Sequence, residues 1–263
     1  MKDCEWKVDV LLPGTWKGAT SVLVTDGRRH IMVDTGMPHE SHQLVAALAE
    51  RGIRPADVES VINTHFHVDH VLNNSLFPNS VIYASQECYD WCCSLYSSLL
   101  DEARWEKLVL KFYPETLDYQ RAGELMGKLR KIGLRWWDPK RLGAPAQFRW
   151  IETGALPDGL ESVSTRGHVP GHLSIVVPTA EERTIIAGDV VLTREVDTEV
   201  LTMIPRERRQ FELDRETLLS IGGRILPGHG SEFLSKDLAR PCTLGSERRS
   251  SGPVPRRRAQ SRQ

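Results

Sequence analysis

The chain has 263 residues, of which 40% are hydrophobic and 26% are charged, values typical of a globular domain. This composition excludes disordered, collagen-like and coiled-coil proteins. The sequence contains no stretch of about 18 apolar residues, and its N-terminus lacks the apolar core of a signal peptide. We therefore expect no transmembrane helix, no membrane partner and a cytoplasmic location.

The formal net charge of −1 hides an uneven distribution. Seven Arg and one Glu give residues 240–263 a charge of +6, which leaves −7 for residues 1–239. An acidic body is a poor general binder of nucleic acid, so this class of partner is disfavoured, although charge alone does not exclude it. Residues 240–263 are also rich in Ser, Pro and Gly and nearly free of apolar side chains. We predict that they form a basic disordered tail.

Strand patterns alternate with turns in the first third of the chain. Strands are predicted at 6–12, 20–25, 30–33, 58–63 and 80–84. Asp26-Gly27 is typical of a hairpin turn between the second and third of them. An amphipathic helix is predicted at 39–51, with Gly52 as its stop signal.

A helical, aromatic-rich insertion is predicted at about residues 86–149. Eleven of the chain's 18 aromatic residues lie between Tyr89 and Trp150. Short strands then return at 148–152, 160–165, 174–178, 184–187 and 224–226, with a helix at 214–221 before the last. Two sheets packed face to face and covered by helices fit this order, and we expect one domain over residues 1–239.

The strongest chemical signal is the run His65-x-His67-x-Asp69-His70, directly after a predicted strand. Alternate residues of an extended segment point the same way, so His65 and His67 can hold one cation. If the chain then turns into a helix, Asp69 and His70 face a second cation beside the first. Imidazole and carboxylate together suit Zn²⁺ and similar divalent ions. Without a metal, burying these polar groups in a core would cost free energy.

Three further segments each place a metal-capable side chain beside a glycine at a predicted strand end. They are Gly167-His168, whose loop continues to His172, Gly188-Asp189 and Gly228-His229. Glycine allows the backbone to approach a metal site closely. A single His at a turn is more often a surface residue, so the ordered set carries the signal.

In this order, the motifs resemble those of the metallo-β-lactamase superfamily of dinuclear metallohydrolases. The matching motifs are V-D-T-G at 33–36, H-x-H-x-D-H, G-H with a second His four residues later, G-D and P-G-H. The resemblance covers about residues 8–233. It implies an α/β fold, an αββα sandwich with the active site along one edge of the two sheets.

The resemblance also implies a role for each candidate site residue. Seven side chains would hold two divalent ions: His65, His67 and His168 the first, Asp69, His70 and His229 the second, and Asp189 both. Asp34 would orient a ligand imidazole, and His172 would be a structural or outer partner rather than a ligand. Zinc is the favoured metal, with iron or manganese as alternatives.

A mechanism follows from the charge of such a centre. Two divalent ions keep a net positive charge after two carboxylates and a metal-bridging hydroxide are counted, so the pKa of bound water falls to about 7. The hydroxide would attack the substrate, and Asp69 is the candidate catalytic residue that passes a proton to the leaving group.

Two substrate classes remain open. The acidic body and the aromatic insertion favour a small, partly apolar lactone, carboxylic ester or thioester. Arg166 and Arg194 lie next to the metal-binding loops in sequence and could neutralise a phosphate, so the alternative is a phosphodiesterase or nuclease. A metal-binding or redox protein without hydrolysis is disfavoured, because flavodiiron-type relatives usually replace one His of the H-x-H pair with Glu.

The Trp-rich insertion is the main indication of specificity. Trp136 and Trp137 are predicted to form an apolar wall for the substrate. The alternative is that the insertion is a helical subdomain or a homodimer face, which buries its rings for stability.

Overall fold

Two β-sheets form the centre of the structure, a computed structural model that describes residues 5–112, 119–154, 156–157, 159–195 and 208–238. The first sheet has the strand order β1-β2-β3-β4-β5-β6. Its strands are β1 (Lys7–Leu12), β2 (Ser21–Thr25), β3 (His30–Val33), β4 (Ser60–Ile62), β5 (Val81–Ala84) and β6 (Phe148–Trp150). β1 to β3 are antiparallel, whereas β3 to β6 run parallel.

The second sheet has the order β11-β10-β9-β8-β7. Its strands are β7 (Glu161–Ser164), β8 (Leu173–Val177), β9 (Thr184–Gly188), β10 (Arg224–Pro227) and β11 (Phe233–Leu234). β9 and β10 run parallel, whereas the other neighbouring strands described in this sheet are antiparallel. β11 was not predicted, because two residues are too few to show an alternating pattern.

Alternation along the strands separates the core between the sheets from the cores under the helices. Val24, Ile31 and Ile62 of the first sheet pack against Ile175 and Ile186 of the second. Successive side chains of a strand point to opposite faces, so their neighbours face outward.

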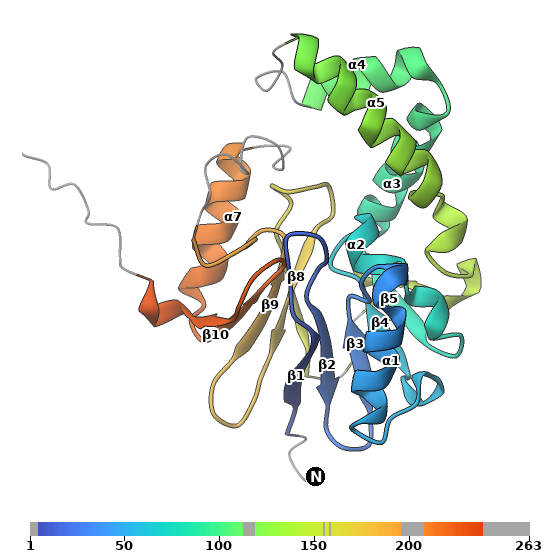
Figure 1. Cartoon of the computed structure of the whole chain (residues 1–263). Helices are drawn as coiled ribbons and strands as arrows, with labels where there is room; N and C mark the ends of the chain where they lie inside the picture. Colours follow the sequence, from blue (N-terminus) through green and yellow to red (C-terminus); the bar gives the residue numbers. More distant parts are fainter. Residues whose placement is uncertain (1–4, 113–118, 155, 158, 196–207, 239–263) are drawn as a thin grey trace, which may run out of the picture.

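Helices cover both outer faces of the sandwich (Figure 1). Leu44 and Leu48 of α1 (Ser41–Ala49) pack on the first sheet, together with Cys88 and Cys92 of α3 (Gln86–Leu99). Phe211 of α7 (Arg208–Ser220) packs on the second sheet. The predicted αββα sandwich is therefore confirmed.

The helical insertion connects β5 to β6. It contains α3, α4 (Glu102–Phe112) and α5 (Tyr119–Trp136), and it projects beyond the sandwich in Figure 1. Trp105 is only 5% exposed and packs with Leu95 and Leu99 in a small core of the insertion.

The tail predicted at 240–263 lies outside the described residues. The helix predicted at 214–221 corresponds to α7, which begins six residues earlier, at Arg208. Within the described ranges, no helix has both the length and the apolar character that a bilayer crossing requires.

Candidate metal centre

Chain segments at the ends of strands meet at one edge of the sandwich. The loop after β4 carries His65 and His67 and enters the short helix α2 (Val68–Val71), with His67 at its N-cap. Asp189 directly follows β9, and His229 follows β10 by one residue. The predicted turn into a helix after His67 is therefore present, and it places Asp69 and His70 beside the other ligands.

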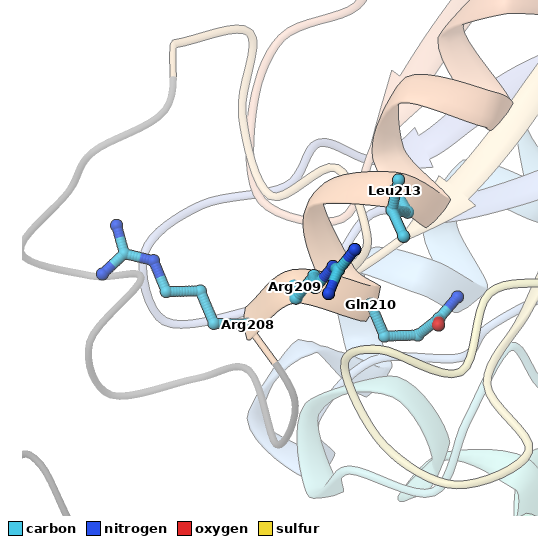
Figure 2. A pocket seen from close by; sticks show the side chains of 4 residues that line it. All are labelled: Arg208, Arg209, Gln210 and Leu213. Atoms are coloured by element: carbon cyan, nitrogen blue, oxygen red, sulfur yellow. The ribbon is translucent and has the colours of Figure 1, made fainter.

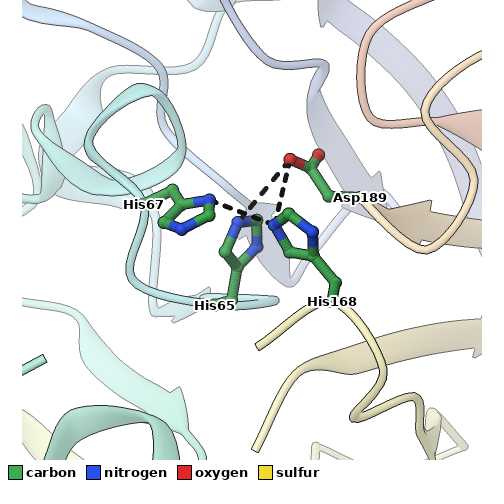
Figure 3. Close-up of side chains that lie close together, drawn as sticks. All are labelled: His65, His67, His168 and Asp189. Carbon is green, nitrogen blue, oxygen red and sulfur yellow. Dashed lines mark hydrogen bonds and ion pairs between the residues drawn. The ribbon is translucent and has the colours of Figure 1, made fainter. Parts of the chain in front are cut away.

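Figure 3 shows the first group of side chains, formed by His65, His67, His168 and Asp189. His67 Nδ1 lies 3.1 Å from His168 Nε2, which lies 3.4 Å from Asp189 Oδ2. His65 Nε2 lies 3.8 Å from the same carboxylate oxygen. One potential ligand atom from each residue lies within 4.8 Å of the others, so the group is compact enough to hold one ion.

The second group contains Asp69, His70 and His229. His229 Nε2 lies 3.4 Å from Asp69 Oδ2 and 3.3 Å from Asp189 Oδ1. His70 Nε2 lies 3.1 Å from that same Oδ1. The two oxygens of Asp189 thus face different groups, Oδ2 the first and Oδ1 the second.

Several buried polar atoms at this edge have no hydrogen-bond partner among the described residues. They include His65 Nε2, His70 Nε2 and Asp189 Oδ1, all of which point into the cluster. A buried polar atom without a partner costs about 1–3 kcal/mol, so native structures contain few of them. Divalent cations would satisfy these atoms, and the imidazole and carboxylate donors fit such a group.

Asp34 orients His70 from a strained backbone position. It directly follows β3 and has a φ of 55°, a left-handed conformation that costs a non-glycine residue energy. Its Oδ2 lies 2.7 Å from His70 Nδ1 and accepts a hydrogen bond from Thr64 Oγ1, while its Oδ1 accepts one from the Thr64 N–H. With Nδ1 held by this carboxylate, His70 presents Nε2 to the cluster.

Main-chain and hydroxyl groups hold two other imidazoles. His229 Nδ1 lies 2.8 Å from the Thr15 carbonyl oxygen, which fixes the proton on Nδ1 and leaves Nε2 as the ligand atom. His65 Nδ1 lies 3.1 Å from Thr64 Oγ1. No spacing in the sequence marks Thr15 or Thr64 for these roles.

His172 uses both of its ring nitrogens for other contacts. Its Nε2 accepts a hydrogen bond of 3.0 Å from the Asp189 N–H, and its Nδ1 lies 2.7 Å from Thr165 Oγ1. It therefore has no free lone pair for a metal, and it positions the backbone of Asp189 instead.

Gly228 is required by the close packing around Asp189. A Cβ at this position would lie 2.2 Å from Asp189 Oδ1 and 3.0 Å from the Gly188 carbonyl oxygen. Any side chain here would displace the carboxylate that both groups share.

The two groups have opposite protonation tendencies in the metal-free chain. Burial lowers the pKa of His65 and of His168 well below the usual value, and it also lowers that of His67. Burial likewise lowers the pKa of His229, but the charge and hydrogen bond of Asp189, together with the charge of Asp69, outweigh it and raise the value to about 9. For His70, Asp189 and Asp34 together outweigh burial, so its pKa is raised well above the usual value.

The two predicted wall residues of the insertion have different surroundings. The Trp137 ring lies 5.9 Å from the His67 ring, as does that of Trp91, which was not predicted as part of the wall. Trp136 instead packs against guanidinium groups, 4.7 Å from Arg135 and 5.5 Å from Arg141. Trp137 and Trp91 therefore border the first group.

A separate pocket of about 510 Å³ lies at the start of α7. It is lined by Arg208, Arg209, Gln210 and Leu213 (Figure 2). None of these side chains belongs to either candidate metal group.

Comparison with known proteins identifies the family. The model of the metallo-beta-lactamase superfamily matches residues 14–229, which span both groups of ligand-type side chains. The chain belongs to this superfamily. A human relative, metallo-beta-lactamase domain-containing protein 1, is 28% identical over 240 residues, which cover 90% of this chain and 72% of the relative.

Other members of the superfamily carry more specific names. N-acyl homoserine lactonase AttM of Azorhizobium caulinodans is 28% identical over 160 residues, covering 59% of this chain and 51% of that protein. The solved structure of AidC, a dizinc quorum-quenching lactonase, superposes with a TM-score of 0.55 at 17% identity, covering 86% of this chain and 85% of AidC. That structural likeness shows the fold, and membership of the superfamily makes this chain a metal-dependent hydrolase.

The structure brings all seven predicted ligand side chains to one edge, in the two predicted groups. Asp34 and His172 lie beside them as outer partners of His70 and Asp189. Their roles toward a bound metal stay predictions.

Proposed function

We propose that this superfamily member is a dinuclear hydrolase that cleaves a lactone, carboxylic ester or thioester. The observation that carries the proposal is the arrangement around Asp189, whose two oxygens face two separate groups of buried ligand atoms. Two divalent ions are needed to satisfy both groups, and zinc suits their nitrogen and oxygen donors best.

Bound ions would lower the pKa of a bound water to about 7 and polarise the carbonyl of the substrate. The protein residues supply orientation and proton transfer. Asp34 and the Thr15 carbonyl fix the tautomers of His70 and His229. Asp69 is half-buried, and its carboxylate is the group that can take a proton and pass it to the leaving group.

The surroundings of the site favour a carboxyl derivative over a phosphodiester. Trp137 and Trp91 offer apolar surface next to His67, which suits an acyl chain or a ring. The two arginines that could neutralise a phosphate have other partners. Arg166 pairs with Glu87 at 2.5 Å, and Arg194 donates to the Asp237 carbonyl oxygen at 3.0 Å. The named lactonases of the superfamily support the same class.

A panel of substrates tests this proposal. The purified, metal-loaded chain is assayed with lactones of different acyl length, an aryl ester, a thioester and a bis-aryl phosphodiester. We expect the highest kcat/KM for one of the carboxyl derivatives. If the phosphodiester is cleaved far faster than any of them, the chain is a phosphodiesterase of the same superfamily and the substrate class proposed here is wrong.

A further inference from the structure

His168 differs from the other buried imidazoles in how it is held. His70, His229 and His65 each have Nδ1 beside an oxygen atom, as described above. His168 Nδ1 is buried and has no hydrogen-bond partner in the described part of the chain, while its Nε2 points into the first group. The orientation of this side chain therefore depends on the backbone that carries it.

That backbone is attached to the middle of α7 by a carboxylate. Asp214 Oδ2 accepts a hydrogen bond of 2.7 Å from the Gly167 N–H, directly before His168. Asp214 is only 8% exposed, and its other oxygen accepts a hydrogen bond of 2.7 Å from Gln210 Nε2. Both carboxylate oxygens are thus used to hold one geometry.

The contact between Gly167 and α7 leaves no space for adjustment. A Cβ on Gly167 would lie 2.1 Å from the Phe211 backbone nitrogen, so the loop lies directly against the helix. The same helix also holds the loop after Asp189, because Arg215 donates to the Arg194 carbonyl oxygen and Phe211 packs with Val190. α7 therefore supports two of the segments that carry ligand side chains.

We propose that Asp214 is a positioning residue that sets His168 for metal binding in the first group. The proposal rests on the dinuclear function proposed above. A carboxylate can accept through both of its oxygens, which suits a tether that must hold a loop without help from the imidazole itself. Loss of the carboxylate would leave the buried Gly167 N–H without a partner and free the loop to shift.

The test compares the Asp214→Ala variant with two other variants of the same helix. Asp214→Asn keeps an oxygen that can accept from Gly167, because Gln210 can turn its amide to match. Glu212→Ala removes an exposed carboxylate that pairs with Arg208, so it is the matched control. Full-length zinc-loaded protein is titrated with a chromophoric chelator, and kcat and KM are measured alongside.

We expect Asp214→Ala to weaken the binding of one ion of the two by about 10–100-fold and to lower kcat by a similar factor. Asp214→Asn should recover most of this loss, and Glu212→Ala should match the wild type. Asp34→Ala, which acts on His70, should weaken the other ion. The double variant with Asp214→Ala should then weaken both.

Two results would overturn the inference. One is an Asp214→Ala protein that retains both ions as tightly as the wild type. The other is an Asp214→Ala protein that binds both ions more weakly by the same factor, since that would indicate general destabilisation. If this variant fails to fold, equally weakened binding of both ions in Asp214→Asn decides the same question. A wild-type chain that holds a single ion would instead overturn the dinuclear proposal. The chelator titration does not depend on the substrate, so the two failures are distinguishable.

Discussion

The two ligand groups share Asp189 but differ in almost every other respect. The first group consists of three imidazoles whose pKa values are all lowered, chiefly by burial. The second combines Asp69, which is half-buried, with two imidazoles whose pKa values are raised by neighbouring carboxylates. Near pH 7, the imidazoles of the first group are therefore neutral and can bind a metal ion directly. Those of the second group must first release protons.

The groups also differ in the origin of their order. In the second group, a carboxylate and a carbonyl contact the ring nitrogens directly. In the first group, His168 Nδ1 has no hydrogen-bond partner among the described residues, and a hydrogen bond holds the backbone just before it, while His67 has aromatic rings beside it. A ligand whose ring nitrogen is hydrogen-bonded is oriented by that contact itself. A ligand held through its backbone depends on the packing of α7, a helix distant in sequence. Variants can therefore be chosen that affect one group or both.

Removal of the shared carboxylate should have the largest effect. Asp189→Ala deprives both groups of an oxygen and removes the carboxylate that lies beside both His70 and His229. We expect loss of at least one ion and a fall in kcat/KM of more than about a hundredfold, beyond the usual effect of losing an outer partner. Elemental analysis and the hydrolase panel measure both. Wild-type metal content and rate in this variant would contradict the sharing of Asp189.

Removal of the direct tether should separate the two groups. Asp34→Ala frees the Nδ1 of His70 and removes the acceptor of the Thr64 N–H. We expect one ion to bind about 10–100-fold more weakly and the other, whose ligand His65 Asp34 reaches through Thr64, to change less. Chelator competition measures the two affinities. His39→Ala, which changes an exposed residue just before α1, is the control. Equal weakening of both ions would mean that the groups are not independent.

The pH dependence of metal binding should also differ between the groups. The pKa of His229 is raised to about 9, so below that pH the metal-free chain holds a proton that an ion must displace. The affinity of the second group should therefore rise with pH up to about 9, by about tenfold per unit for each proton released. The lowered pKa values of His65 and His168 predict little change for the first group above about pH 7. Chelator competition at several pH values tests this, and two parallel profiles would contradict it.

The ligands were predictable from sequence because they lie in short runs at strand ends, where local spacing indicates their chemistry. The groups that hold them were not. The carbonyl of Thr15 is 214 residues from His229 and is a main-chain atom, so no residue type marks it. Asp214 lies 47 residues from Gly167.

The start of α7 was missed for a related reason. Its first residues, Arg208 to Leu213, are mostly polar and show no clear helical period, so the prediction began at Asp214. The aromatic insertion was predicted as one unit, but its rings separate into a local core around Trp105, a border at Trp137 and a cation-stacked Trp136. Neighbouring residues of a helix end point in different directions, and composition cannot show this.

A smaller effect is expected from the aromatic border of the first group. Trp137→Ala should raise KM for an apolar ester or lactone by about tenfold, the value of a pocket contact of roughly 1–3 kcal/mol, without loss of metal. Trp136→Ala is the matched control, because its ring packs on Arg135 and Arg141 rather than on His67, and KM should change by less than about twofold. Equal effects of the two substitutions, or loss of metal in Trp137→Ala, would remove Trp137 from the substrate wall.

The most direct test of the account is the number of metal ions per chain. The full-length protein is purified under gentle conditions, and metal content is measured by elemental analysis against protein concentration from amino-acid analysis. The shared geometry of Asp189 predicts two divalent ions in the wild type and fewer in His65→Ala. A wild-type protein that holds no more than trace metal after incubation with zinc, iron or manganese would contradict it.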